Sequence, residues 1–142
     1  MPSAGRPAGL LVDTSVAVAL SVGDHEQHVA VSRDLRGRSL GLAGHAAFET
    51  LSVLTRLPPP ARRSPATIGR LLEASFPDSR YLGVRAAASL LAELGSVGIA
   101  GGAVYDALVG ACANEHELPL ATLDRRAVEI YRALNVRIEW LG

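Results

Sequence analysis

Short apolar runs alternate with helix-like segments along the 142-residue chain, and this alternation limits the possible folds more than any other feature. The strand-like runs lie at residues 9–13, 39–44, 79–84, 118–123 and 136–141. Helical patterns follow residue 13 and recur at about 24–36, 45–57, 65–76, 87–94, 103–116 and 124–134. Such alternation is typical of βαβ units, in which helices cover both faces of a parallel sheet. We therefore expect a three-layer α/β/α fold with a parallel central sheet of about four to five strands.

The length and composition fit a single domain. With 49% apolar residues, 142 residues can build one hydrophobic core. We expect one domain over residues 1–142, with residues 1–8 forming a frayed start. The only cysteine, Cys112, lies in a helix of small residues, so we expect a buried free thiol and no intrachain disulfide.

The charged residues exclude several classes of protein. The formal net charge is zero, so attraction to nucleic acid would depend on a local patch. All 14 basic residues are arginines, which excludes any mechanism that requires a lysine. Asp13 interrupts the first apolar run, which argues against an export signal or a membrane span there. The cytoplasm is therefore the expected location.

Four acidic residues fall where strands end or helices begin. Asp13 and Asp124 each follow a strand-like run, Asp106 lies in the first turn or so of its helix, and Glu49 lies early in the 45–57 helix. In a βαβ fold, strand carboxyl ends and helix amino ends share one edge of the sheet, where ligands bind. We expect these four carboxylates to meet at that edge.

Each of these acids also has a purely structural interpretation. Asp13 and Asp124 are suitable N-caps for the helices that follow them. Asp106 is favoured near a helix amino end by the helix dipole. Glu49 precedes Arg56 by seven residues on roughly the same helix face, as an exposed acid would.

Taken together, the four acids favour a metal site. The helix neighbours of Asp106 are Val109, Gly110 and Ala113, so its surroundings look buried, and an unpaired buried carboxylate is costly. Converging carboxylates are stable when they share protons or bind divalent cations. Oxygen ligands suit Mg²⁺ or Mn²⁺, and the hydroxyls of Thr14, Ser15 and Thr122 are candidates for orienting the carboxylates or bound water.

The order of these motifs resembles the PIN-domain ribonucleases, and most closely their VapC toxin branch. The matching pieces are Asp13-Thr14-Ser15 after the first strand, an isolated Glu49, the segment YDALVGACA at 105–113, and LPLATLD at 118–124. The resemblance covers nearly the whole chain.

The resemblance implies a particular activity and particular partners. It implies a type II toxin that hydrolyses RNA with Mg²⁺ or Mn²⁺, with Asp13, Glu49, Asp106 and Asp124 as catalytic and metal-binding residues. It also implies a homodimer silenced by a small VapB-type antitoxin. Many relatives carry a further acid or Asn shortly after the last Asp, where this chain has Arg125, Arg126 and Ala127. Whether the site binds one metal ion or two therefore remains open.

Arg125 and Arg126 have two interpretations: forked hydrogen bonds to an RNA phosphate, or a solvated helix start.

Among rival enzymes, phosphotransfer through an aspartyl phosphate is disfavoured, because Ser15 stands where a D-x-D motif needs its second Asp and because lysine is absent. The rival outside enzymes is a PIN-like module that binds RNA or protein without cutting.

Overall fold

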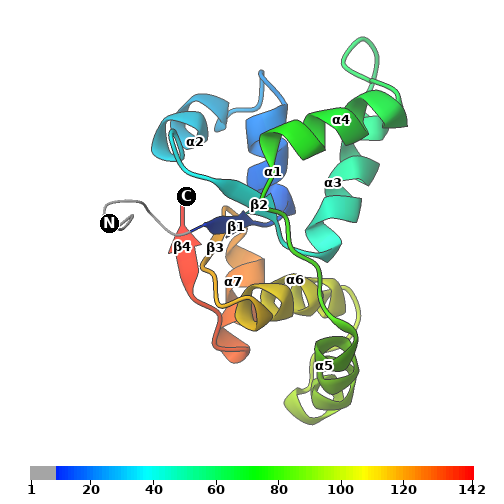
Figure 1. Ribbon diagram of the computed structural model, residues 1–142, viewed down its shortest axis with the longest axis vertical. Helices are drawn as coiled ribbons and strands as arrows, with labels where there is room; N and C mark the ends of the chain where they lie inside the picture. Colours follow the sequence, from blue (N-terminus) through cyan, green and yellow to red (C-terminus); the bar gives the residue numbers. More distant parts are fainter. Residues whose placement is uncertain (1–8) are drawn as a thin grey trace.

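Four parallel strands form the centre of the molecule (Figure 1). The structure is a computed structural model that describes residues 9–142, so the expectation for residues 1–8 lies outside the described residues. The strands are β1 (Leu10–Val12), β2 (Leu40–Leu42), β3 (Leu120–Thr122) and β4 (Ile138–Trp140), in the order β2-β1-β3-β4. All three strand pairings are parallel, which confirms the predicted sheet.

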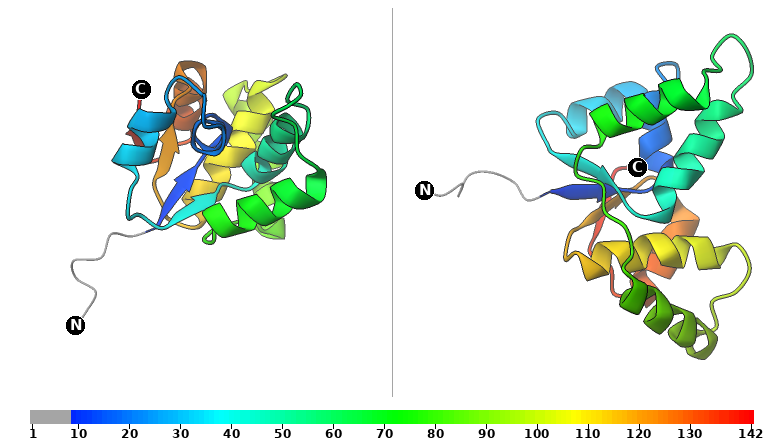
Figure 2. Two further views of the ribbon diagram at one scale, coloured as in Figure 1. Left: turned by 90° about the horizontal axis from the view of Figure 1, so that it is seen from above. Right: turned by 45° about the vertical axis from the view of Figure 1, so that its right-hand side comes forward.

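Helices cover both faces of this sheet, and the expected three-layer α/β/α fold is confirmed. Figures 1 and 2 show α1 to α4 on one side and α5 to α7 on the other. Their bounds are α1 (Thr14–Ser21), α2 (His28–Asp34), α3 (His45–Thr55), α4 (Pro65–Ser75), α5 (Val84–Val97), α6 (Ala103–Glu115) and α7 (Arg125–Ala133).

The strand β1 shows why the sheet is buried on both faces. Leu10 and Val12 pack into the core on the side of α1 to α4, whereas Leu11 packs into the core beside α5 to α7. All three side chains are fully buried. Successive strand residues point to opposite faces, so a strand covered on both sides must be continuously apolar.

One predicted strand, residues 79–84, is not formed. The chain there runs beside β2 in extended form but makes a single bridge, between Ala43 and Arg80. The Asp78 and Arg80 amides donate to the Leu40 and Leu42 carbonyls. The helix α5 then begins at Val84 and continues to Val97, so it extends beyond the predicted segment 87–94 at both ends.

Two smaller expectations can be compared with the structure. Cys112 is fully buried, as expected, and burial raises the pKa of its thiol to about 12. The helix predicted at 24–36 is shorter, because residues 24–27 form turns before α2 begins at His28.

Among residues 9–142, no helix combines the length and apolarity needed to cross a membrane.

Candidate active site

The candidate site lies where the chain changes direction across the sheet. From β1 the chain crosses to β2 on one side, and later returns to form β3 on the other side of β1. Ligands of open α/β sheets bind at the carboxyl ends of strands flanking such a switch point. Asp13 directly follows β1, and Asp124 lies two residues after β3.

Asp13 is the most buried acid of this site. It is 4% exposed, and its carboxylate accepts four hydrogen bonds. Oδ1 accepts from the Ser15 hydroxyl at 2.5 Å and from the Val16 amide at 3.3 Å. Oδ2 accepts from the Thr122 hydroxyl at 2.5 Å and from the Tyr131 hydroxyl at 2.9 Å. Burial raises the pKa of Asp13, and these four donors oppose the rise by stabilising the charged form.

Tyr131 is the residue that sequence reasoning missed. Tyr131 lies in α7 and is 1% exposed. Its hydroxyl donates to Asp13, which lies 118 positions earlier in the chain. The signal in the sequence was helical spacing, because Tyr131 follows Asp124 by seven residues and Ala127 by four, on one face of α7. A core tyrosine usually needs a partner for its hydroxyl, and here that partner is Asp13.

Ser15 and Thr122 join the loops that follow β1 and β3. The Ser15 hydroxyl donates to Asp13 and accepts from the Leu123 amide at 3.0 Å. The Thr122 hydroxyl donates to Asp13 and accepts from the Asp124 amide at 3.0 Å. Both hydroxyls therefore fix the direction of the Asp13 carboxylate. The third predicted hydroxyl, Thr14 Oγ1, is buried and has no hydrogen-bond partner among residues 9–142.

Asp124 combines a structural role with a place at the site. Its Oδ1 accepts from the amides of Arg126 at 2.9 Å and Ala127 at 3.4 Å, so it caps α7. Asp13 caps α1 in the same way through the Val16 amide. The capping interpretation is therefore correct for both residues. The cap uses only one carboxylate oxygen in each case, and the second oxygen of Asp13 accepts from Thr122 and Tyr131.

Electrostatics connect Asp106 to the other three acids. Asp106 lies in the first turn of α6, and its pKa rises from 3.8 to about 6. Partial burial is the largest cause, followed by the negative charges of Asp124, Glu49 and Asp13, while Arg126 opposes the rise. The other three predicted carboxylates are therefore each close enough to Asp106 to disfavour its charged form.

Glu49 lies at the margin of this acidic group. Its side chain is 41% exposed, and Oε1 lies 3.7 Å from Nε2 of His45, one turn earlier in α3. The ring of His45 stacks on Tyr105, with 4.9 Å between ring centroids. Glu49 thus faces His45 rather than Arg56. The stacked rings of His45 and Tyr105 are a contact between α3 and α6.

The donor set of this site suits a hard divalent cation. Carboxylate oxygens, which the four acids offer, are ligands typical of Mg²⁺ or Mn²⁺. In residues 9–142, no three His, Cys, Asp or Glu side chains are arranged to hold one ion together. Mg²⁺ can bind through one or two carboxylates directly, and other acids then reach it through bound water.

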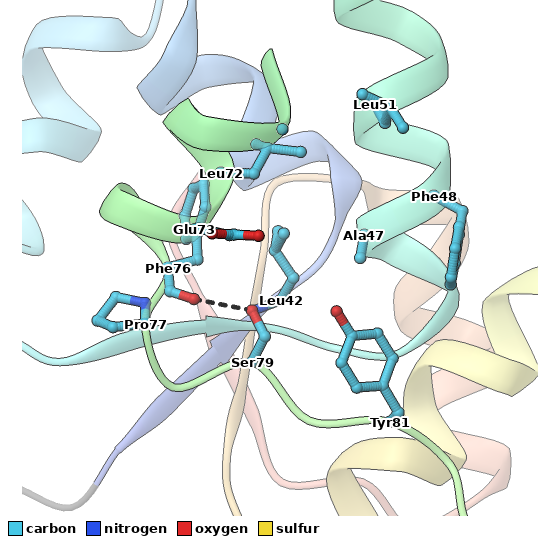
Figure 3. Close-up of a pocket in the computed structure, with 11 residues that line it drawn as sticks. Leu42, Ala47, Phe48, Leu51, Leu72, Glu73, Phe76, Pro77, Ser79 and Tyr81 are labelled. Carbon is cyan, nitrogen blue, oxygen red and sulfur yellow. Dashed lines mark hydrogen bonds between the residues drawn. The ribbon is translucent and has the colours of Figure 1, made fainter. Parts of the chain in front are cut away.

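A separate pocket lies on the other side of α3, between α3, α4 and the segment after α4 (Figure 3). It encloses about 510 Å³. Phe48 and Tyr81 are more than half exposed at its margin, and the Ser79 hydroxyl donates to the Phe76 carbonyl at its base. Its lining is mostly apolar, which distinguishes it from the acidic edge.

Two curated proteins are similar to this chain along almost their whole length. Ribonuclease VapC27 of Mycobacterium tuberculosis (strain ATCC 25618 / H37Rv) is 45% identical over 129 residues, covering 91% of this chain and 94% of that protein. Ribonuclease VapC40 of the same strain is 46% identical over 129 residues, covering 89% and 95%.

Solved structures share the fold at lower identity. VapBC2 from Rickettsia felis, bound to a DNA fragment from its promoter, matches with a TM-score of 0.68 and 13% identity, covering 95% of this chain and 100% of that one. Mycobacterium tuberculosis VapC20, a toxin that cleaves the sarcin-ricin loop, matches with a TM-score of 0.66 and 16% identity, covering 84% and 93%.

The PIN domain family model matches residues 10–133, which include all four acids of the site. Together with 45% identity across nine-tenths of the chain, this match places the protein in the PIN-domain family, in the group that contains the VapC ribonucleases.

Proposed function

We propose that this protein is a metal-dependent ribonuclease toxin of a type II toxin–antitoxin pair, and that it hydrolyses RNA phosphodiester bonds at the acidic edge of its sheet. The observation that carries the proposal is the gathering of carboxylates at this edge, where the charges of Asp13, Glu49 and Asp124 all act on Asp106. The similarity to VapC27 and VapC40 supports the choice of RNA as substrate.

In this proposal Asp13 is the fixed ligand of the site. Four donors hold its carboxylate in one orientation, so little freedom is lost when a cation binds. Asp106 and Asp124 contribute further oxygens from the starts of α6 and α7. Glu49, which is more exposed, completes the site or orients the attacking water.

Mg²⁺ or Mn²⁺ is the proposed cofactor. When bound, such an ion lowers the pKa of a coordinated water and stabilises negative charge on a phosphate oxygen. Its charge also offsets the repulsion among the four carboxylates. Arg126, whose charge acts on Asp106, is the proposed ligand of an incoming phosphate, and its guanidinium suits a forked hydrogen-bond pair.

A small VapB-type antitoxin is the proposed partner, together with a second copy of this chain. The support comes from structural neighbours, among them a DNA-bound VapBC from Salmonella typhimurium with a TM-score of 0.69 and 17% identity.

The test is cleavage of labelled total RNA by purified protein freed of any partner. Discrete fragments are expected with Mg²⁺ or Mn²⁺, and none with a chelator present. Intact RNA in the presence of folded protein and metal would contradict the proposal and favour a PIN-like module that binds without cutting. Binding of the same RNA, measured by gel shift, would identify that module.

A further inference from the structure

We propose that the groove between α7 and β4 binds a single-stranded segment of the RNA substrate, with one base stacked on Trp140 and phosphates held by Arg125 and Arg132. This inference rests on the proposed ribonuclease function. The groove encloses about 430 Å³ and is lined by Arg125, Val128, Glu129, Arg132, Ile138 and Trp140. We call it the Trp140 groove.

The secondary structure explains why these residues share one surface. The four from α7 follow helical spacing, at i, i+3, i+4 and i+7, so they lie on one face of the helix. Ile138 and Trp140 are two residues apart in β4 and therefore point to the same face of the strand. Because β4 is the last strand of the sheet, no further strand covers this side within residues 9–142.

Trp140 is the groove residue on which a base would stack, on the part of its ring that Arg125 and Gly142 leave uncovered. It is the only tryptophan of the chain and remains 39% exposed although it belongs to a strand. The guanidinium carbon of Arg125 lies 5.3 Å from the centroid of its ring. Base stacking on an aromatic ring, reinforced by a neighbouring arginine, is a recurring way of binding single-stranded nucleic acid without strict sequence preference.

The charge of the groove fits a phosphate backbone. Two guanidinium groups face one carboxylate, that of Glu129, in a protein whose net charge is zero. In the described part of the chain, neither Arg125 nor Arg132 forms an ion pair with an acid. Neither charge is therefore neutralised by an acid, although the Arg125 guanidinium lies over the Trp140 ring, and the planar fork of arginine matches phosphate geometry.

Two groove residues lie next to residues of the acidic edge in the chain or in the sheet. Trp140 pairs with Thr122 in the β3–β4 register, and the Leu141 amide donates to the Thr122 carbonyl at 3.1 Å. Thr122 in turn donates its hydroxyl to Asp13. Arg125 directly follows Asp124 in the chain. An RNA strand bound along the carboxyl ends of β3 and β4 would therefore pass from Asp124 to Arg125 and Trp140.

The single tryptophan makes the proposal directly measurable. The probe is a mixed-sequence single-stranded oligoribonucleotide, added with Mg²⁺ to the Asp13→Asn protein so that it is not cut. We expect saturable quenching of Trp140 fluorescence by RNA and no quenching by inorganic polyphosphate, which offers charge without bases. RNA that binds, as measured by anisotropy of a labelled oligonucleotide, but leaves the emission unchanged would overturn the proposal.

Cleavage kinetics separate this proposal from the proposed function. Trp140→Leu is expected to raise the KM for RNA about tenfold, with kcat within about twofold, and Trp140→Phe is expected to recover part of the loss. Leu91→Ala, at an exposed apolar residue of α5 outside the groove, is the control and should leave KM unchanged.

Each outcome has one meaning. Cleavage by the wild type with an unchanged KM in Trp140→Leu would overturn the groove and leave the ribonuclease intact. No cleavage by the folded wild type would instead contradict the ribonuclease itself. Fluorescence that responds to purified antitoxin but not to RNA would assign the groove to the protein partner and overturn the proposal.

Discussion

At the scale of single residues, the molecule is organised around one buried carboxylate. Asp13 is surrounded by apolar β1 and α1, yet it accepts hydrogen bonds from Ser15, Val16, Thr122 and Tyr131. A buried charge is tolerated only when it is compensated in this way. The same bonds that make Asp13 tolerable also orient it, so the stability of the core and the geometry of the site depend on the same atoms.

Tyr131→Phe tests whether that orientation matters. The variant keeps the buried ring and removes only the hydroxyl that donates to Asp13. We expect a stability loss of about 1 kcal/mol and a fall in RNA cleavage of about tenfold, as is typical when a group that orients a metal ligand is removed. Thermal melts and kcat measure the two effects. Wild-type kcat in Tyr131→Phe would contradict this role, and Tyr81→Phe serves as the control.

The raised pKa of Asp106 predicts a pH-dependent stability. Between about pH 4 and 6 the folded protein keeps a proton on Asp106 that the unfolded chain releases. The metal-free protein therefore loses stability as pH rises through this window. Asp106→Asn does not titrate, so its stability relative to wild type should increase from pH 4 to pH 7. Urea unfolding with a chelator measures this difference, and a pH-independent difference would be the contrary result.

The sequence predicts those site residues whose position in the pattern of strands and helices is unusual for their chemistry. The acids were found because each stands beside a strand end or a helix start, and Asp13 interrupts an apolar run. Their metal-binding and catalytic roles remain predictions. Tyr131 could not be assigned in the same way, because a tyrosine on an apolar helix face also fits an ordinary core. Only the packing of α7 against the sheet brings its hydroxyl to Asp13.

At the scale of elements, β2 shows how close packing defines the edge of the sheet. A Cβ atom on Gly41 would lie 2.1 Å from the Asp78 carbonyl oxygen, so the extended segment after α4 can run against this strand only at a glycine. This contact positions residues 78–80, which make a single bridge with the sheet. The predicted strand at 79–84 was wrong, because an apolar pattern does not show how many backbone hydrogen bonds a segment makes with a neighbouring strand.

Gly41→Ala tests this packing. The added methyl collides with backbone, which cannot rotate away, so we expect a stability loss of about 2–3 kcal/mol. Gly69→Ala is the matched control, since Gly69 lies within α4 and a methyl added there would meet open space. That variant should gain about 0.5–1 kcal/mol through helix propensity. Equal stabilities of the two variants in urea unfolding would contradict this role of Gly41.

The strong elements were predictable and their ends were not. Short, mostly apolar runs identified all four strands. In β1 the run is continuously apolar because the strand is buried on both faces, whereas β4 contains Glu139 and is only partly buried. The end of α3 before Pro58 and the start of α4 at Pro65 follow from proline chemistry. The start of α2 was misplaced by four residues, because the polar segment 24–27 forms turns that fit a helical pattern equally well.

At the scale of the whole molecule, topology brings together groups from distant parts of the chain. Thr122 lies 109 positions from Asp13 in the chain, and Tyr131 lies 118 positions away, yet both donate to it. The crossing from β2 through four helices to β3 creates this meeting point. The predicted fold is confirmed because alternating strands and helices leave few topologies for a parallel sheet.

Metal binding should therefore be visible as a property of the whole fold. A ligand that binds only the folded state raises its stability in proportion to RT ln(1 + [L]/Kd). With Mn²⁺ near saturation we expect the Tm of the wild type to rise by about 3–8 °C. Asp13→Asn, which keeps an acceptor for the α1 cap, should show less than half of that rise. Equal shifts in both proteins would place the metal elsewhere.

The central claim is that Asp13, Glu49, Asp106 and Asp124 form one ribonuclease site. The most direct measurement compares RNA cleavage by the four single variants in which Asp becomes Asn or Glu becomes Gln, each confirmed as folded by its thermal melt. The matched control is Glu93→Gln, at an exposed acid of α5. We predict losses of about 100-fold or more for the three aspartates, a smaller loss for the exposed Glu49, and wild-type activity for Glu93→Gln. Wild-type cleavage by Asp13→Asn or Asp106→Asn would contradict the claim.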